Sequence, residues 1–206
     1  AAPRLMGCGI FVGGIAMENT NRTKILTECA LLIALGTILA QVKIYELPQG
    51  GSVTAASMVP FMIISFRHGP LWGLGCGFIN AIFQMLLGGV YPTPAGTALA
   101  MVLQVLLDYL VPFSQIGIAD IFARLLGKGK ASSHMVAAFM VGLLRFFCHF
   151  VSGFVVWGSI TQDGISAVIY SLSYNGGFML PETVINVAAV GLLYRSAPLL
   201  FGKDGF

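Results

Sequence analysis

The sequence predicts an all-α integral membrane protein, with six transmembrane helices in one compact bundle and both termini in the cytoplasm. Of its 206 residues, 57% are hydrophobic and 9% are charged, whereas soluble domains carry about 25% charged residues. Several apolar stretches approach the ~20 residues that an α-helix needs to cross a bilayer. The basic residues gather in alternate connections between these stretches. This composition excludes a secreted soluble protein, and no basic cluster suggests nucleic-acid binding.

Each of six apolar segments predicts a helix. The polar connection 43–57 is rich in Gly and Pro, which predicts a loop long enough to fold over the bundle. Pro112 predicts a kink in the fourth helix, and Gly176, Gly177 and Pro181 predict an interruption of the sixth. The predicted helices span residues 24–43, 57–67 (short), 70–88, 96–126, 134–158 and 166–195.

The basic residues orient this topology. In a six-span chain nearly all of them fall on one side of the membrane, and only Lys43 lies on the other. Cytoplasmic connections carry an excess of Lys and Arg, so both termini are expected to be cytoplasmic. The residues on the basic side are Arg22, Lys24, Arg67, Arg124, Lys128, Lys130, Arg195 and Lys203.

The beginning of the chain does not resemble the rest. MENTNRTKIL reads as a natural start at Met17, and the apolar run before it is too short to span a membrane. We therefore interpret residues 1–16 as a tag or other non-native extension and 17–206 as a single six-helix membrane domain.

Five ionisable residues fall within the predicted spans, where charge is costly and tends to mark function. Glu28 lies near a helix end and is expected to snorkel or cap. Arg145 and Glu182 are expected at similar depth on neighbouring helices, as a structural ion pair rather than ligand contacts. Asp108 and His149 fit a structural explanation less well.

Residues on three predicted helices are expected to reach one level in the outer half of the bilayer, at 1.5 Å of rise per residue. A carboxylate beside aromatic faces and amides suits a flat, cationic, nitrogen-rich small molecule. The pattern therefore predicts an occluded binding site, without a catalytic group, metal or cofactor. The candidate substrate-binding residues are Asp108, Tyr109, His149, Trp157, Tyr170, Tyr174 and Asn175.

Four stretches together resemble the ThiT family, the thiamine-specific substrate-binding subunits (S-components) of energy-coupling factor (ECF) transporters. LPQGGSV followed by SMVPFMIISFRHG resembles the family's first loop and second helix, and LLDYLVPF its acidic-Tyr motif. RFFCHFVSGFVVWGS and YSLSYNG resemble its fifth and sixth helices. The similarity runs from about residue 24 to 195.

The resemblance implies that six of the candidate residues sandwich and hydrogen-bond the two rings of thiamine: Asp108, Tyr109, His149, Trp157, Tyr170 and Asn175. Asp108 stands where many members have glutamate. The first loop lacks the tryptophan that some members carry, and Tyr45 is a possible substitute, whereas Trp72 lies too near the cytoplasmic side for a direct ligand role. The resemblance also implies that Ala30 and Ala34, a small-xxx-small pair, dock onto a transmembrane coupling subunit.

The expected function is therefore high-affinity thiamine capture at the extracellular side of a bacterial plasma membrane. The chain has no Walker A motif, so ATP-driven uptake would need a coupling subunit and two separate ATPase subunits. The alternatives are an S-component for another vitamin or precursor, such as riboflavin or hydroxymethylpyrimidine, and an autonomous secondary transporter. An intramembrane hydrolase using His149 and Ser152 is disfavoured, because no GxSxG or HExxH pattern accompanies them.

Overall fold

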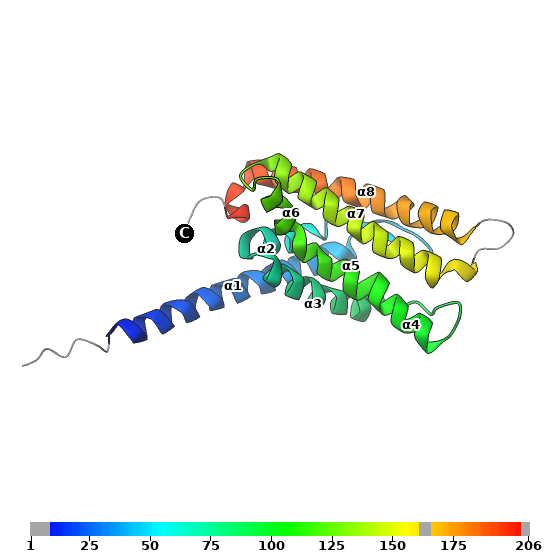
Figure 1. Ribbon diagram of the computed structural model, residues 1–206, viewed down its shortest axis with the longest axis horizontal. Helices are drawn as coiled ribbons and strands as arrows, with labels where there is room; N and C mark the ends of the chain where they lie inside the picture. Colours follow the sequence, from blue (N-terminus) through cyan, green and yellow to red (C-terminus); the bar gives the residue numbers. More distant parts are fainter. Residues whose placement is uncertain (1–8, 161–165, 203–206) are drawn as a thin grey trace, which may run out of the picture.

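The helices lie mostly along one axis of the molecule (Figure 1). The structure is a computed structural model that describes the backbone of residues 9–160 and 166–202, with side chains from residue 22 onward. Residues 1–8, half of the proposed N-terminal extension, lie outside the described residues. The six helical segments are α1 (Gly9–Gln41), α2 (Val59–His68), α3 (Pro70–Gly88), the compound segment α4–α6 (Ala98–Leu125), α7 (Ala131–Val155) and α8 (Ala167–Ser196).

Five of these segments in the described chain are long and apolar enough to cross a membrane, one fewer than the sequence predicted. The exception is α2, whose 10 residues would extend only about 15 Å. Its side chains from Val59 to Phe66 are buried, and Phe61, Met62 and Phe66 are among the least exposed of the core. Helix α2 is therefore a core helix, enclosed by the others.

A β-hairpin occupies most of the predicted loop between α1 and α2. Strand β1 (Lys43–Glu46) pairs antiparallel with β2 (Ser52–Thr54). The backbone N–H of Thr54 donates to the Glu182 carboxylate, 2.6 Å away, near the middle of α8. The hairpin thus reaches into the bundle from the end where α1 finishes. Helix α2 then carries the chain from the middle of the bundle to the opposite end. Irregular backbone inside a membrane protein is tolerated where protein or a cavity satisfies its polar groups.

The fourth segment is continuous but changes helix type around Pro112. It consists of α4 (Ala98–Gln104), a π-helical turn η1 (Val105–Leu110), α5 (Val111–Ser114), a 3₁₀ turn η2 (Gln115–Ile118) and α6 (Ala119–Leu125). Proline has no N–H to donate to the preceding turn, so altered hydrogen bonding beside Pro112 is expected. The π turn contains Asp108 and Tyr109.

Helix α8 runs without a break through Gly176, Gly177 and Pro181, so the predicted interruption is wrong. Pro181 cannot donate to the carbonyl of Gly177, yet the helix continues on both sides. Backbone groups in a membrane have few partners outside their own helix, which favours a continuous helix over a break. A β-carbon added to Gly176 or Gly177 would have no neighbouring atom within 4 Å, so these glycines do not mark a close helix contact.

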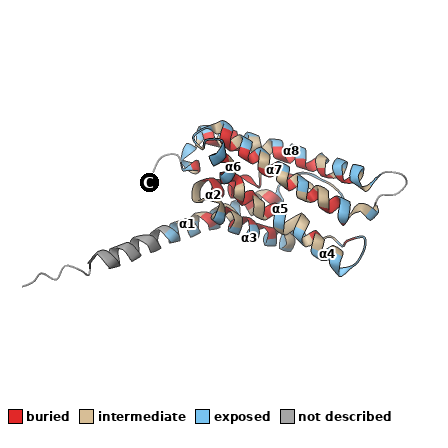
Figure 2. Ribbon diagram, in the orientation of Figure 1, coloured by how far each residue is buried: buried red, intermediate tan, exposed pale blue. Residues whose placement is uncertain are grey.

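Close contact between α7 and α8 instead depends on other small residues. A β-carbon on Gly142 would meet Thr183 at 2.5 Å, and one on Gly153 would collide with Ser171 and Asn175. Small residues let membrane helices approach closely. The buried residues follow the faces where the helices meet (Figure 2).

At the end of the bundle where α2 finishes, Glu28 binds Arg67 and His68. Its carboxylate lies 2.8 Å from Arg67 Nε and 2.7 Å from His68 Nε2. Arg67 also donates to the carbonyl of Leu199 in the last turn, η4 (Pro198–Phe201). Glu28 therefore connects α1 to α2, which is a more specific role than the snorkelling or capping expected from the sequence.

Candidate functional site

A cavity of about 260 Å³ opens at the end of the bundle where α4 and α8 begin and α7 ends. The hairpin, α3, the π turn η1, α7 and α8 all contribute to its wall. All seven predicted substrate-binding residues line it: Asp108, Tyr109, His149, Trp157, Tyr170, Tyr174 and Asn175. The structure thus brings these seven side chains to one cavity, from the three segments the sequence indicated.

Asp108 connects two aromatic residues from α7 and the turn that follows it. One carboxylate oxygen lies 3.2 Å from His149 Nδ1, and the other accepts a hydrogen bond of 3.1 Å from the indole of Trp157. The imidazole of His149 is almost fully buried, and its Nε2 has no hydrogen-bond partner in the described chain. The three side chains hold one another in a fixed arrangement beside the cavity, with one imidazole nitrogen unused.

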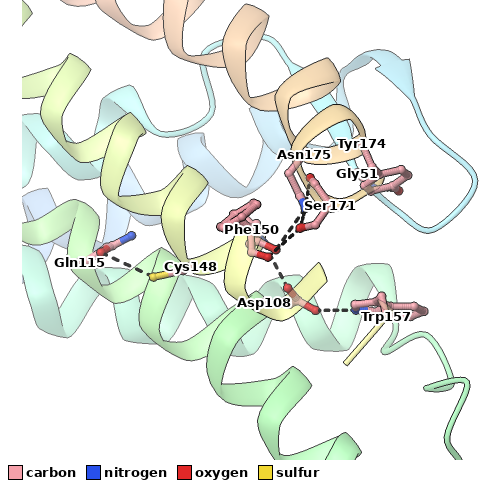
Figure 3. A network of polar contacts seen from close by, with 10 residues as sticks. Gly51, Asp108, Gln115, Cys148, Phe150, Trp157, Ser171, Tyr174 and Asn175 are labelled. Atoms are coloured by element: carbon pink, nitrogen blue, oxygen red, sulfur yellow. Dashed lines mark hydrogen bonds and ion pairs between the residues drawn. The ribbon is translucent and has the colours of Figure 1, made fainter. Parts of the chain in front are cut away.

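Asn175 joins α8 to α7 on the opposite wall. Its amide donates to the carbonyl of His149 at 3.1 Å and to the carbonyl of Ser171 at 2.9 Å. Ser171 in turn donates to the carbonyl of Phe150 at 2.6 Å. These contacts are possible because Gly153, which has no side chain, lets α7 lie close to α8. Figure 3 shows this network beside Asp108 and Trp157.

Tyrosines form the side of the cavity nearest the hairpin. Tyr170 and Tyr174, one helical turn apart on α8, stack with ring centroids 5.8 Å apart. The hydroxyl of Tyr174 accepts from the backbone N–H of Gly51 at 3.2 Å (Figure 3). Because a β-carbon on Gly51 would lie 2.6 Å from the ring of Phe178, only glycine allows the hairpin to lie this close to α8.

Tyr109, next to Asp108 in the π turn, bonds across the cavity rim. Its hydroxyl donates to the carbonyl of Gly89, just after α3, at 3.1 Å. The side chain is half-buried on the wall between α3 and α4. The contact fixes the rim of the cavity on the side opposite α8.

The predicted Arg145–Glu182 ion pair is absent from the described chain. Both residues instead line the cavity. Glu182 accepts from the backbone and hydroxyl of Thr54, while Arg145 contacts the sulfur of Met58 and the face of Phe113. The contact between Thr54 of the hairpin and Glu182 joins residues far apart in the chain, so no local feature of the sequence indicates it.

Other cavity residues had only weak sequence signals. Gln104 stands one turn before Asp108 on the same segment, and its amide donates to the carbonyl of Tyr91 at 3.0 Å; helical spacing could have identified it. Phe178, one turn after Tyr174, could have been found in the same way. Trp72 packs against the hydrophobic core and Tyr45 is exposed, and neither lines the cavity.

The site suits binding better than bond-breaking chemistry. It offers a carboxylate held between an imidazole and an indole, an amide, and several aromatic faces. Aromatic faces attract cations, and the carboxylate and amide can make directional hydrogen bonds with ring nitrogens or an amino group. These features suit a flat, positively charged, nitrogen-containing molecule.

A helical membrane bundle with a polar and aromatic cavity at one end defines a class of protein: a multi-pass membrane protein that binds a small solute. Comparison with known proteins is more specific. Residues 26–202 match the family model described as "Thiamine transporter protein (Thia_YuaJ)". The chain belongs to this thiamine transporter family.

Individual relatives agree with this assignment. The chain is 35% identical to the thiamine transporter ThiT of Bacillus subtilis over 198 residues, which cover 91% of this chain and 99% of the relative. It is 29% identical to ThiT of Lacticaseibacillus paracasei over 202 residues, 92% and 96% of the two chains. These relatives and the apolar helices identify a multi-pass bacterial membrane protein.

A solved structure has the same fold. The structure of ThiT from Listeria monocytogenes superposes with a TM-score of 0.70 and 23% sequence identity, covering 88% of this chain and 98% of that one. At this identity the likeness concerns the fold alone. It supports the overall fold described above.

Proposed function

We propose that this chain is the thiamine-binding S-component of an ECF-type importer, which captures thiamine at the outer face of the membrane. The observation that carries the proposal is the cavity in which Asp108 is held between His149 and Trp157. Thiamine combines a permanently cationic ring with an aminopyrimidine, and membership of the thiamine transporter family agrees with this chemistry.

In the proposed complex the seven cavity residues bind the two rings. The carboxylate of Asp108 and the amide of Asn175 are placed for hydrogen bonds to the pyrimidine nitrogens and amino group. The aromatic side chains Trp157, Tyr170 and Tyr174 would enclose the cationic ring, an arrangement worth about 2 kcal/mol or more per desolvated contact. The shorter Asp108, where many members have glutamate, fits because the His149 and Trp157 contacts draw it into position.

The proposed orientation of the chain in the membrane follows from the distribution of basic residues between the two ends of the bundle. Arg67, Arg124 and Lys128 lie at the end opposite the cavity, together with the start of α1 and the last turn η4 (Figure 1). An excess of basic residues favours the cytoplasmic side. We therefore infer that the cavity opens outward and that both termini are cytoplasmic.

Uptake would require partners, because the sequence contains no Walker A motif. We infer that a transmembrane coupling subunit and two ATPase subunits drive import. Ala30 and Ala34 are both exposed on α1, where small residues would let a partner helix approach closely. This face is the proposed docking site.

A binding panel tests the substrate. In the Trp72→Phe variant, Trp157 is the remaining tryptophan, so its fluorescence reports on the cavity. Thiamine at micromolar concentration should quench it, whereas riboflavin should not. Quenching by riboflavin or by hydroxymethylpyrimidine alone would assign the chain to another vitamin or precursor and overturn the thiamine proposal.

Transport assays separate the S-component from an autonomous secondary transporter. Vesicles that contain the purified chain alone should bind thiamine without accumulating it. Vesicles that also contain a coupling module and ATP should accumulate it. Accumulation by the chain alone, driven by an ion gradient, would contradict the S-component proposal.

A further inference from the structure

The aromatic side chains of His149, Trp157, Tyr170 and Tyr174 form an aromatic cage around the outer part of the cavity. Two buried, oppositely charged residues lie deeper in the cavity than this cage. Arg145 and Glu182 both line the cavity, with exposures of 8% and 1%. A buried charge is costly unless it is paired or hydrogen-bonded. The two charges interact electrostatically, but in the described chain no direct ion-pair contact joins them, so their hydrogen-bonding groups have other partners or none.

The guanidinium of Arg145 has N–H donors without a strong hydrogen-bond acceptor. Its Nη1 lies 3.0 Å from the thioether sulfur of Met58, which is a weak acceptor. The guanidinium carbon Cζ lies over the ring of Phe113, 4.5 Å from the ring centroid. Its Nε has no hydrogen-bond partner in the described chain. Arginine carries five N–H donors, so this side chain is held in place by packing while most of its hydrogen-bonding capacity is unused.

Most of the hydrogen-bond acceptor positions of the Glu182 carboxylate are used by protein donors. Oε2 accepts from the Thr54 backbone at 2.6 Å, and Oε1 accepts from the Thr54 hydroxyl at 2.8 Å and from Asn186 at 3.3 Å. A carboxylate offers about four acceptor positions. These contacts leave room for one further donor, on Oε2.

Helix directions turn the two side chains toward each other. Arg145 lies one turn before His149 on α7, and Glu182 lies two turns after Asn175 on α8. At 1.5 Å per residue these positions are about 6 Å and about 10 Å below the His149–Asn175 level. Side chains tilt toward the N-terminus of their own helix. Because α7 and α8 are antiparallel, Arg145 reaches deeper while Glu182 reaches back toward the cage.

We propose that Arg145 and Glu182 together bind the terminal alcohol of the ligand's side arm. The alcohol oxygen would accept from Arg145, and its O–H would donate to the remaining position on Glu182. A hydroxyl is both donor and acceptor, and it matches this pair in a way that neither a purely accepting nor an apolar group can. The proposal rests on thiamine being the ligand, since its hydroxyethyl arm carries such an alcohol.

Within this pair, Glu182 favours the free alcohol over its phosphate esters, whereas Arg145, as a cation with unused donors, would attract a phosphate. Esterification removes the O–H that Glu182 would accept and adds negative charge beside a buried carboxylate. Two like charges at close range in a poorly solvated site repel strongly. Glu182 is therefore a specificity-determining residue, and Arg145 a binding residue for the alcohol oxygen.

Four ligands test this inference by isothermal titration with the purified full chain: thiamine, thiamine monophosphate, an analogue with ethyl in place of hydroxyethyl, and hydroxymethylpyrimidine. The wild-type protein should bind thiamine about tenfold or more tightly than the ethyl analogue. Arg145→Gln should remove this difference by weakening thiamine alone. Glu182→Gln should raise the affinity for the monophosphate relative to thiamine about tenfold.

A control separates the charge of Glu182 from its contact with the hairpin. Thr54→Val removes one hydrogen bond to Glu182 but keeps the carboxylate, so it should leave the ratio of thiamine to monophosphate affinities unchanged. Hydroxymethylpyrimidine lacks the side arm, so its affinity should change little in Arg145→Gln and Glu182→Gln, which also verifies that both variants fold.

Two results would overturn the inference: equal wild-type affinity for thiamine and the ethyl analogue, or an unchanged selectivity ratio in Glu182→Gln. Either result with normal thiamine binding would leave the proposed function standing. Absence of thiamine binding by the wild-type protein would instead remove the proposed function itself.

Discussion

Asp108 is the residue on which the geometry of the cage depends. Its two carboxylate oxygens each hold an aromatic side chain, His149 at 3.2 Å and Trp157 at 3.1 Å. Hydrogen bonds to charged groups contribute about 1.5–3 kcal/mol each. A change at Asp108 would therefore affect both the ligand and the aromatic residues around it.

Asp108→Asn should weaken thiamine binding by about tenfold to a hundredfold, because an amide replaces one carboxylate oxygen by a donor and removes the charge. Isothermal titration measures the change. Glu46→Gln is the matched control: this carboxylate is partly exposed at the cavity rim and pairs with Lys43, and exposed ion pairs contribute little. Unchanged affinity in Asp108→Asn would remove the carboxylate from the site.

At the scale of elements, close packing of α7 against α8 holds the wall of the cavity. Gly153 lies where a β-carbon would collide with Ser171 and Asn175, the residues that bond the two helices together. By contrast, a β-carbon added to Gly75 on α3 would have nothing within 4 Å. The two glycines therefore respond differently to the same substitution.

Gly153→Ala should destabilise the protein by about 1–3 kcal/mol, the typical effect of overpacking. Gly75→Ala should be neutral or stabilising, because alanine has the higher helix propensity by about 1 kcal/mol. Thermal unfolding in the same detergent compares the two. Equal melting temperatures would show that α7 and α8 can separate at Gly153 without penalty.

Most long elements could be predicted from sequence, although α1 begins at Gly9, well before its predicted start at residue 24. The irregular elements could not be predicted. Apolar length predicted α3 at Pro70–Gly88 as residues 70–88, and α7 and α8 to within a few residues. The π turn around Asp108 has no distinctive composition, and the hairpin strands lack a clear alternation of apolar and polar residues. The unbroken α8 was missed because the propensities of Gly and Pro measured in water were applied where backbone groups lack water.

The site was predictable in part for a related reason. Polar residues such as His149 and Asn175 stand out within apolar helices, so their gathering at one level followed from helix geometry. Arg145 and Glu182 were also visible, but their relation depends on Thr54, a hairpin residue far away in the sequence. A tertiary contact of this kind leaves no local signal.

At the scale of the whole molecule, charge distribution and surface define how the bundle sits in the membrane. Basic residues gather at one end and the cavity opens at the other. Large apolar side chains, among them Leu71, Leu86 and Leu192, are exposed around the bundle, as expected for a surface that faces lipid. Both properties can be tested in the intact protein.

Cysteine labelling tests the orientation. In a variant whose four cysteines are replaced by alanine, Gln49→Cys in the hairpin should react with a membrane-impermeant maleimide added to intact cells. Lys130→Cys, between α6 and α7, should react only after the cells are permeabilised. The reverse pattern would place the cavity on the cytoplasmic side.

Partner docking is tested on α1. Ala34→Trp should leave thiamine affinity unchanged, because Ala34 is exposed and does not line the cavity, but it should abolish co-purification with the coupling subunit. Leu86→Trp, a large substitution at an exposed position of α3, is the control and should preserve the complex. Co-purification that survives Ala34→Trp would place the docking surface elsewhere.

The π turn from Val105 to Leu110 has a consequence for how ligand preference could change in this fold. A π turn contains one residue more than an α-helical turn, and each residue rotates an α-helix by about 100°. A chain lacking one residue here would close an ordinary α-helical turn, so the helix would still cross the membrane and its flanking parts would keep their relative facing, but the side chains within the turn, Asp108 and Tyr109 among them, would point in different directions. A single-codon deletion, without any substitution at Asp108, could thereby present a different side chain to the cavity and give the fold a new ligand.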